Sequence, residues 1–409
     1  MRSEGARNIL VFNCGSSSLK YRLIRMPGEE ELVCGEAERV GSKTQGQSSI
    51  CHRVRGVPRM ARVDLPDHAA ALRAVAKLLR QDRENDKGLS IDIVAHRYVH
   101  PGTLFKRTAA ITPKVLEKLA DTLDLAPLHN PIIYGLLTLC AKEFSGTRQY
   151  AVFDTAFHST IPAEFFSYAI PRELAAKYKL RKVGFHGISH NYVMQEACRF
   201  LKRDCRDLKM VSCHLGTGGS SVCAIDGGKS INNSMGFTPL EGLMMNTRSG
   251  DLDLGVIFDI MAREDLSGQE AESMFINRSG ILGVFDSSSD LRDVIKSIGV
   301  NPRAKMALDM YVRGIRKYVG YYSLILRKAD VLIFTDSIGV GMPLVRRNVC
   351  ESMESFGISL DPVKNAAYKE AVMDISAAGS QARILVIPTN EEIMIARQAY
   401  KEHERDHHR

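Results

Sequence analysis

The sequence contains one local pattern twice, and this pattern limits the folds open to the chain. Residues 9–12 form a short apolar run, residues 15–18 read Gly-Ser-Ser-Ser, and apolar residues resume directly after this turn. Residues 210–225 repeat the same order of apolar run, Gly/Ser turn and returning apolar run. Short apolar runs bounded by turn residues are typical of β-strands. The sequence therefore predicts two units that each begin with strand, turn and strand.

Further elements follow from helical periodicity, prolines at helix starts and short apolar runs. We expect helices at 66–83, 113–125, 131–141, 253–276, 303–328 and 392–407, and strands at 91–94, 150–153, 331–334 and 383–387. This mixture predicts an α/β fold.

The boundary between the two units is expected near residue 155. The predicted units are 1–154 and 155–391, with the terminal helix 392–409 folding back onto the first unit. The last part of that helix, 401–409, is so rich in charge that we expect it to fray rather than pack.

Composition excludes several classes of protein. The chain has 409 residues, of which 44% are hydrophobic and 25% charged. At ~150 residues per domain, this length predicts two or three domains, and the composition excludes disordered and fibrous proteins. No apolar run approaches the ~18 residues that a membrane helix needs, so we expect no membrane partner. The charged N-terminus is unlike a signal peptide, and a cytoplasmic location is expected.

Cysteine and charge patterns narrow the possible ligands. The nine cysteines are scattered and form no Cys-x-x-Cys pair, which favours reduced thiols over a disulfide or a zinc site. The net charge is +8, but the basic residues are dispersed and form no basic helix. We therefore expect no nucleic-acid partner, whereas anionic small molecules remain open as ligands.

Three Gly-rich turns, at 15–18, 216–221 and 338–341, each follow an apolar strand. Backbone N–H groups on such turns form concavities that suit phosphate oxygens. The known phosphate motifs do not match, however. Cys223 stands where a P-loop needs its first glycine, and two of the turns lack the third glycine of the dinucleotide fingerprint.

A second group of residues is cationic, imidazole-rich or acidic. Arg97 follows a strand, His129 follows Pro127-Leu128, and His186 and Arg248 lie in glycine-containing loops. Such side chains can hold a phosphoryl group and spread its charge. A lone loop histidine is also often a hydrogen-bonded structural residue.

The sequence also contains candidate metal ligands. Asp154 and Glu391 each end a strand, where carboxylates can hold Mg²⁺ beside a nucleotide phosphate. The pairs His96/His100 and His186/His190 lack the Glu of His-Glu-x-x-His, which argues against zinc.

Five blocks of the sequence resemble those of the acetate kinases, in the family's order across nearly the whole chain. They are Asn-Cys-Gly-Ser-Ser-Ser-Leu-Lys at 13–20, Phe-Asp-Thr-Ala-Phe-His at 153–158, Gly-Phe-His-Gly-Ile-Ser-His at 184–190, Gly-Phe-Thr-Pro-Leu-Glu-Gly at 236–242 with Thr-Arg-Ser-Gly-Asp at 247–251, and Ile-Pro-Thr-Asn-Glu-Glu at 387–392. The resemblance implies two ribonuclease-H-like domains of the actin/hexokinase type with mixed sheets and a cleft between them. It also implies a homodimer whose interface and nucleotide site belong to the second domain.

The resemblance implies reversible, Mg²⁺-dependent phosphoryl transfer from ATP to acetate, giving acetyl phosphate and ADP, with Mn²⁺ as an alternative ion. Asn13 and Arg97 would act at the phosphoryl and acetate end, and Arg248 would clamp the transferring group. His186 and His129 would stabilise its charge. Metal would be placed by Asn13, Asp154 and Glu391, and Asp154 would also orient the acetate. A small pocket for the acetate methyl group would be lined by Val99, Leu128, Phe185 and Pro239.

The nucleotide end departs from the family pattern. The resemblance implies nucleotide contacts from Ser16, Ser18, Lys20, His214, Gly216, Thr217, Gly218, Asp290, Leu291, Arg292, Ile338, Gly339 and Gly341. The family usually has Asn where Thr217 stands, Phe where Leu291 stands, and Ala-Gly-Ile-Gly-Glu-Asn where residues 336–341 read Asp-Ser-Ile-Gly-Val-Gly. Asp290 with Arg292 could equally form a surface ion pair.

These departures leave three alternatives open beside ATP-dependent acetate kinase. One is a variant that uses pyrophosphate and phosphate in place of ATP and ADP, as a few family members do. A second is a non-catalytic relative that keeps the fold. The third is a propionate kinase. Because one methylene is worth only ~1–3 kcal/mol, we expect preference for acetate with leakage to propionate.

Overall fold

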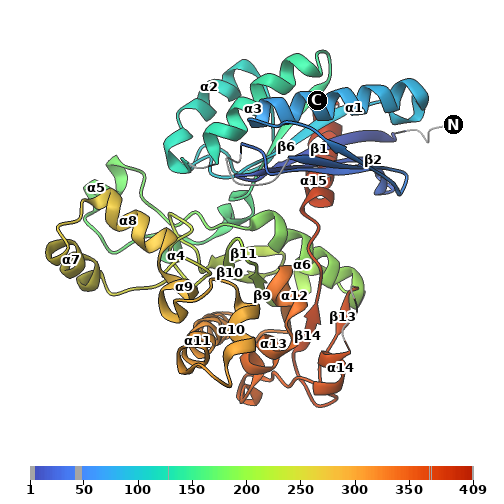
Figure 1. Ribbon diagram of the computed structural model, residues 1–409. Helices are drawn as coiled ribbons and strands as arrows, with labels where there is room; N and C mark the ends of the chain where they lie inside the picture. The colour runs from blue at the N-terminus through green and yellow to red at the C-terminus, as the bar shows by residue number, and fades with distance from the viewer. Residues whose placement is uncertain (1–4, 42–47, 128, 368, 370, 408–409) are drawn as a thin grey trace. The chain divides into compact units, whose positions relative to one another are not determined.

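The computed structural model describes residues 5–41, 48–127, 129–367, 369 and 371–407. The chain divides into two compact units, one of Met1–Ala156 with Asn390–Arg409 and the other of Phe157–Thr389 (Figure 1). The predicted first boundary, after residue 154, lies two residues before the observed one. The C-terminal segment that returns to the first unit begins at Asn390, and Leu128, predicted to line a methyl pocket, lies outside the described residues.

The first unit is built on an eight-stranded mixed sheet with the order β5-β4-β3-β2-β1-β6-β8-β7. Its strands are β1 (Arg7–Cys14), β2 (Ser18–Met26), β3 (Glu30–Glu38), β4 (Ser49–Val54), β5 (Val57–Arg62), β6 (Ile93–Tyr98), β7 (Ala109–Ala110) and β8 (Arg148–Phe153). Strands β1 to β5 form an antiparallel meander, whereas β1, β6 and β8 are mutually parallel neighbours. Parallel strands end at one edge of a sheet, so residues that follow β1, β6 and β8 are brought together.

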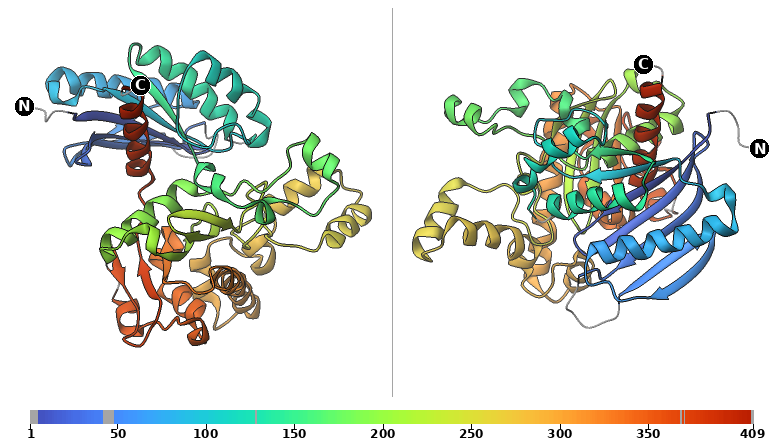
Figure 2. Two further views of the ribbon diagram at one scale, coloured as in Figure 1. Left: turned by 180° about the vertical axis from the view of Figure 1, so that it is seen from behind. Right: turned by 90° about the horizontal axis from the view of Figure 1, so that it is seen from above.

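Helices cover the two faces of this sheet (Figures 1 and 2). They are α1 (His68–Asn85), α2 (Pro113–Ala120), α3 (Asn130–Glu143) and α15 (Glu391–His407). Leu10 and Phe12 of β1 belong to the core with α1 and α3, while α15 packs against β1, β2, β6 and β8. This division follows from the period of two along a strand, which sends alternate side chains to opposite faces.

The end of α15 differs from expectation. The helix continues to His407, and Glu402 and His403 are only 8% and 5% exposed. The Tyr150 hydroxyl on β8 lies 3.2 Å from Nδ1 of His403 and donates to Asp406 at 3.1 Å. The prediction that 401–409 would fray is therefore wrong for 401–407, because one face of this charged stretch packs against the sheet.

The second unit repeats the arrangement of the first. Its six-stranded sheet has the order β11-β10-β9-β12-β14-β13, with β9 (Lys209–Leu215), β10 (Ser220–Asp226), β11 (Lys229–Asn233), β12 (Val331–Thr335), β13 (Met373–Asp374) and β14 (Arg383–Val386). The series β11-β10-β9-β12-β14 has the same order and strand directions as β3-β2-β1-β6-β8. The predicted duplication, and the α/β fold with two mixed sheets, are confirmed.

Helices also cover both faces of the second sheet. The helices of this unit are α4 (Ala163–Phe166), α5 (Arg172–Lys177), α6 (Gly187–Leu201), α7 (Leu254–Arg263), α8 (Gly268–Asn277), α9 (Gly280–Phe285), α10 (Leu291–Ser297), α11 (Pro302–Ile325), α12 (Asp336–Gly341), α13 (Pro343–Cys350) and α14 (Pro362–Ala366). The long helix α11 buries one side of the sheet, and α6 buries the other. No helix in the described part of the chain is both long and apolar enough to cross a lipid bilayer.

The third predicted Gly-rich turn is wrong. After β12 the chain enters helix α12 directly, with Asp336 in the left-handed region at φ +62°. Ile338 is 1% exposed and belongs to the hydrophobic core. Residues 336–341 therefore form a short packed helix rather than an open phosphate-binding turn.

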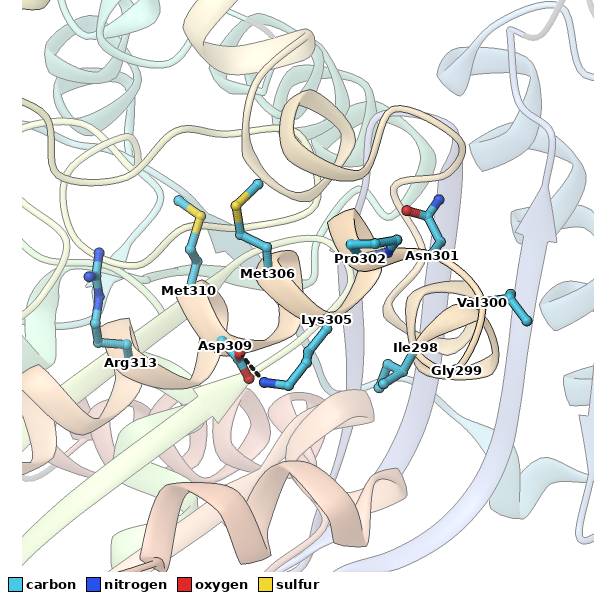
Figure 3. A pocket seen from close by; sticks show the side chains of 10 residues that line it. All are labelled: Ile298, Gly299, Val300, Asn301, Pro302, Lys305, Met306, Asp309, Met310 and Arg313. Carbon is cyan, nitrogen blue, oxygen red and sulfur yellow. Dashed lines mark hydrogen bonds and ion pairs between the residues drawn. The ribbon is translucent and has the colours of Figure 1, made fainter.

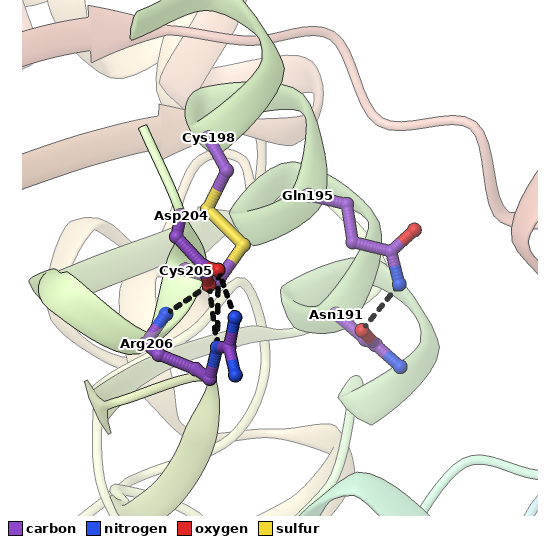
Figure 4. The surroundings of a disulfide bond; sticks show 6 residues. All are labelled: Asn191, Gln195, Cys198, Asp204, Cys205 and Arg206. Atoms are coloured by element: carbon purple, nitrogen blue, oxygen red, sulfur yellow. Dashed lines mark hydrogen bonds and ion pairs between the residues drawn. A yellow bond between two sulfur atoms is a disulfide. The ribbon is translucent and has the colours of Figure 1, made fainter. Parts of the chain in front are cut away.

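The expectation of nine reduced thiols is also wrong, because Cys198 and Cys205 form a disulfide (Figure 4). Lys202, at φ +52°, ends α6 and reverses the chain, and this reversal brings the two Cα atoms to 5.5 Å. A spacing of seven residues resembles no common motif, so the sequence did not indicate the pair. The other seven cysteines are free.

Helix α12 is held in place by a buried cation, Arg346 on α13. Its side chain is 0% exposed and donates to the carbonyls of Gly339 and Val340 and to Asn365. These bonds satisfy carbonyl groups at the end of α12 that have no intrahelical donor. Arg346 therefore stabilises the helix that begins with Asp336.

We predict that Arg346→Met destabilises the protein by about 2–4 kcal/mol, because it leaves buried carbonyls without donors at roughly 1–3 kcal/mol each. The shift in the urea unfolding midpoint measures this. The matched control is the exposed neighbour Arg347→Met, which should change stability by less than about 0.5 kcal/mol. Equal effects of the two substitutions would contradict the role given to Arg346.

Candidate active site

In the first unit, the predicted residues meet where the parallel strands end. Asn13 lies near the end of β1, Arg97 near the end of β6, Asp154 directly after β8, and Glu391 at the start of α15. Arg97 donates to Asp154 Oδ2 at 2.8 Å and to Asn13 Oδ1 at 3.3 Å, and its Nη1 lies 3.6 Å from Glu391. Strand topology thus brings together four residues that are far apart in the sequence.

Charge at this edge is densely packed and largely buried. Burial alone would lower the pKa of Arg97, but the carboxylates of Asp154 and Glu391 raise it above its ordinary value. Asp154 is 1% exposed, yet its Oδ1 accepts no hydrogen bond from the described residues. Arg97 therefore stays charged, and one buried carboxylate oxygen stays available to a ligand.

This donor set fits Mg²⁺. The ion prefers oxygen ligands, and it is usually held by one or two carboxylates together with water and substrate phosphate. The unpartnered Oδ1 of Asp154 and the carboxylate of Glu391 are such donors. Among the described residues no cluster of three His, Cys, Asp or Glu side chains forms a metal site, so substrate and water would complete the coordination.

Glu392 is a member of this site that the sequence analysis missed. It is 7% exposed, and its Oε1 accepts from Asn13 Nδ2 at 3.0 Å, while the same amide donates to Glu391 at 3.2 Å. The pair of adjacent acids at 391–392 was visible in the sequence. Only the packing of α15 against β1 shows that both reach Asn13.

In the second unit, Arg248 and His186 lie on either side of the turn between β9 and β10. A Cβ atom on Gly219 would lie 3.3 Å from Nε2 of His186 and 3.4 Å from Nη1 of Arg248. His186, at φ +56°, immediately precedes α6, whose N-terminus carries partial positive charge. Backbone, imidazole and guanidinium thus converge on a single anion-binding position.

Arg248 is a cation without a counter-charge. Within the described residues it forms no ion pair, and its Nη1 donates a hydrogen bond to the Met245 sulfur, at 3.8 Å. Desolvation lowers its pKa below the ordinary value, although a guanidinium remains charged at neutral pH. Such an arrangement favours binding of an anion, which would supply the missing counter-charge.

Neighbouring histidines orient His186. Its Nδ1 and His190 Nε2 both lie 2.9 Å from the Ser221 hydroxyl, and its ring stacks on His214 at 4.1 Å between centroids. Burial lowers the pKa of His190 well below its ordinary value, so this ring is neutral. Ser221, which the sequence analysis missed, links the two imidazoles.

The predicted nucleotide loop is occupied by side chains of α12. The Asp336 carboxylate pairs with His214 Nε2 at 3.2 Å and fills the space beside Gly216, where an added Cβ would overlap it. The backbone N–H of Thr217 donates to the Ser337 hydroxyl at 3.2 Å. Groups expected to receive phosphate oxygens therefore face an acid and a hydroxyl of the protein itself.

The other predicted nucleotide residues are spread over both units. Asp290 caps α10 and forms an ion pair with exposed Arg292, while Leu291 is buried. Gly218 and Gly341 are exposed and Gly339 is buried against Phe334. In the first unit, Ser16 lies in the turn between β1 and β2, and Ser18 and Lys20 lie in β2.

The predicted methyl pocket is likewise divided. Of its members among the described residues, Val99 belongs to the first unit and Phe185 and Pro239 to the second, so the pocket stays a prediction. His129, predicted to stabilise the phosphoryl charge, also belongs to the first unit. A hollow of about 600 Å³ does open beside the start of α11 (Figure 3). It is lined by Val300, Met306 and their neighbours and contains none of the predicted site residues.

Two duplicated α/β units, each built on a mixed sheet of the same strand order, have the architecture of the actin/hexokinase-like class of phosphotransferases. Comparison with known proteins gives the family. Residues 8–397 match the model of the acetokinase family, so the chain belongs to that family, and the predicted recognition is confirmed.

Individual relatives agree with this assignment. The chain is 44% identical to an acetate kinase of Desulfitobacterium hafniense over 393 residues, covering 95% of this chain and 97% of the relative. The crystal structure of an acetate kinase from Porphyromonas gingivalis matches with a TM-score of 0.88 at 38% identity, over 97% of this chain and 99% of that one. A propionate kinase structure from Francisella tularensis matches with a TM-score of 0.88 at 34% identity, over the same shares.

We predict that inorganic phosphate or sulfate raises the melting temperature of the wild-type protein, because an anion that binds only the folded state stabilises it. At a concentration of about 100 Kd the gain is roughly 2.7 kcal/mol. Arg248→Ala should abolish most of this gain, and thermal unfolding at several phosphate concentrations measures it.

The matched control is Arg206→Ala, since Arg206 is an exposed arginine that pairs with Asp204 away from the site. It should keep the full response to phosphate. An unchanged response in Arg248→Ala would show that this guanidinium does not bind the anion.

Proposed function

We propose that the chain catalyses reversible, Mg²⁺-dependent phosphoryl transfer from ATP to acetate, giving acetyl phosphate and ADP. The observation that carries this proposal is the unpaired Arg248 beside His186 and Gly219. Acetate is already an anionic nucleophile and needs no general base. The reaction instead requires positive charge and in-line placement, which overcome the repulsion between two anions.

In the proposed reaction a carboxylate oxygen of acetate attacks the γ-phosphorus, and the bond from that phosphorus to the bridging oxygen of ADP breaks. Arg248 and His186 stabilise the charge on the equatorial oxygens, as cationic and imidazole donors do in phosphoryl transfer. His129 adds to this stabilisation. The ADP oxygen leaves as an anion, so no proton is transferred.

Residues of the first unit bind acetate and the metal ion. Arg97, kept charged and oriented by Asp154 and Asn13, would bind the acetate carboxylate. Asn13, Asp154 and Glu391 would hold Mg²⁺, or Mn²⁺ in its place. The ion neutralises phosphate charge when bound.

The methyl pocket of Val99, Leu128, Phe185 and Pro239 stays a prediction. We propose acetate as the preferred acceptor, with propionate as a weaker one.

The cytoplasmic location stays a prediction.

The test of this function is acyl-phosphate formation by the purified protein, trapped as the hydroxamate with hydroxylamine. We expect product with acetate, Mg²⁺ and ATP. Arg248→Ala should lower the rate by about 10²–10⁴-fold, as for loss of a main charge stabiliser, and Arg206→Ala should not. The same assay is run with pyrophosphate in place of ATP, and in reverse from acetyl phosphate and phosphate. If folded wild-type protein forms no product in any of these assays, the chain is a non-catalytic relative.

A second candidate donor, pyrophosphate, is favoured by one observation. The Asp336 carboxylate fills the space beside Gly216, and the Ser337 hydroxyl accepts from the N–H of Thr217. These positions would otherwise receive the phosphates of the donor. A carboxylate about 4 Å from a phosphate charge costs up to ~4 kcal/mol at an effective dielectric constant near 20. A donor that needs fewer contacts at this loop would be affected less.

We predict that Asp336→Ala lowers the KM for ATP by about tenfold or more, because it removes this repulsion, and changes the pyrophosphate reaction less. Steady-state kinetics with each donor measure the effect. Asp336→Asn is the matched control, since it keeps the size of the side chain and removes its charge. An ATP KM and an ADP affinity that stay at wild-type values in both variants would contradict the role of Asp336.

We also propose that the chain forms a homodimer through α7. None of the residues of α7 is buried, and Leu254 and Phe258 are 67% and 66% exposed. An apolar helix face of this kind usually marks an interface. The predicted dimer interface in the second unit is consistent with this surface.

We predict that Phe258→Asp converts the dimer to a monomer, because it places a charge in a desolvated contact. Sedimentation or light scattering across a range of concentrations measures the mass. Lys296→Asp, on the exposed face of α10, is the control and should leave the dimer intact. A wild-type protein that is monomeric at micromolar concentration would contradict the proposal.

A further inference from the structure

Two imidazoles meet near the end of α15, far along that helix from Glu391. His403 and His407 lie one turn apart, and their Nε2 atoms are 3.0 Å from each other. The ring centroids are 4.4 Å apart. The intervening sequence reads His-Glu-Arg-Asp-His, which is the helical His-Glu-x-x-His spacing that places two imidazoles on one face to bind a metal ion.

A hydrogen-bond chain sets the tautomer of His403. The Tyr150 hydroxyl donates its single proton to Asp406 Oδ2, at 3.1 Å. His403 Nδ1, 3.2 Å from the same hydroxyl oxygen, must therefore be the donor in its own hydrogen bond to Tyr150. Its Nε2 then carries a lone pair, directed toward His407. Hydrogen bonding at one ring nitrogen, which frees the other for metal, is the usual arrangement of a metal-binding histidine.

We propose that His403 and His407 bind a divalent transition-metal ion, Zn²⁺, Ni²⁺ or Cu²⁺, through their Nε2 atoms. Two bonds of about 2.0–2.1 Å to one ion place the donor atoms ~3 Å apart, which is the separation seen here. Imidazole suits these ions, whereas Mg²⁺ prefers oxygen ligands, so the site is independent of the proposed reaction.

The proposed site binds a metal ion but catalyses no reaction. No third His, Cys, Asp or Glu joins the pair as a ligand among the described residues, and water would fill the remaining positions. The bound ion would link two successive turns of α15 and stabilise the folded helix, since it binds the native state only.

The test is calorimetric titration of the full-length protein with Zn²⁺ and with Ni²⁺ in chelator-free buffer containing Mg²⁺. We expect one strong site per chain, together with a rise in melting temperature. His407→Ala, which alters an exposed side chain, should weaken binding at this site by at least about tenfold. The control is His408→Ala, the next histidine in the sequence, and it should bind as the wild type does.

A second variant tests the hydrogen-bond chain. Tyr150→Phe keeps the ring and removes only the hydroxyl, and it should weaken metal binding by about 10–100-fold, the usual effect of losing a partner of a metal-bound histidine. Unchanged affinity in His407→Ala would overturn the proposal, because thiols or the histidines elsewhere would then account for binding. Equal losses in His407→Ala and His408→Ala would likewise overturn it in favour of a non-specific terminal chelate.

Discussion

The ion pair between Arg97 and Asp154 is the contact on which the first half of the site depends. It joins the ends of two neighbouring parallel strands, β6 and β8. Asn13 on β1 and the first residues of α15 complete the same cluster. Because parallel strands end at a common edge of the sheet, the charged residues at their ends lie close together. The returning C-terminal helix supplies the remaining acids, so the first unit needs both ends of the chain.

Arg97 in the first unit and Arg248 in the second have opposite electrostatic surroundings, and this difference fits the proposed phosphoryl transfer. In the first unit, Arg97 is surrounded by carboxylates, which fix its position and raise its pKa. In the second, Arg248 has no acidic partner among the described residues. A compensated cation suits orientation of a small carboxylate, whereas an uncompensated one suits a phosphoryl group on which negative charge must be stabilised.

The local elements and the order of the chemical groups follow from the sequence alone. Alternating apolar runs and Gly/Ser turns act over a few residues, so β1–β2 and β9–β10 follow from local propensity. Strand ends and loops are local features too, and therefore Arg97, Asp154 and Glu391 could be selected as candidates, as could Arg248 and His186. Family resemblance added Asn13 and assigned the individual roles, for which spacing alone is not diagnostic.

Only the tertiary structure decided the features that depend on packing across the chain. A left-handed residue at Asp336 turns an expected loop into α12 and brings its acid to Gly216, and a left-handed Lys202 joins Cys198 to Cys205. Burial of His403 against Tyr150 orders a charged segment that looked unable to pack. These features depend on contacts between residues distant in sequence, so local composition and spacing do not predict them.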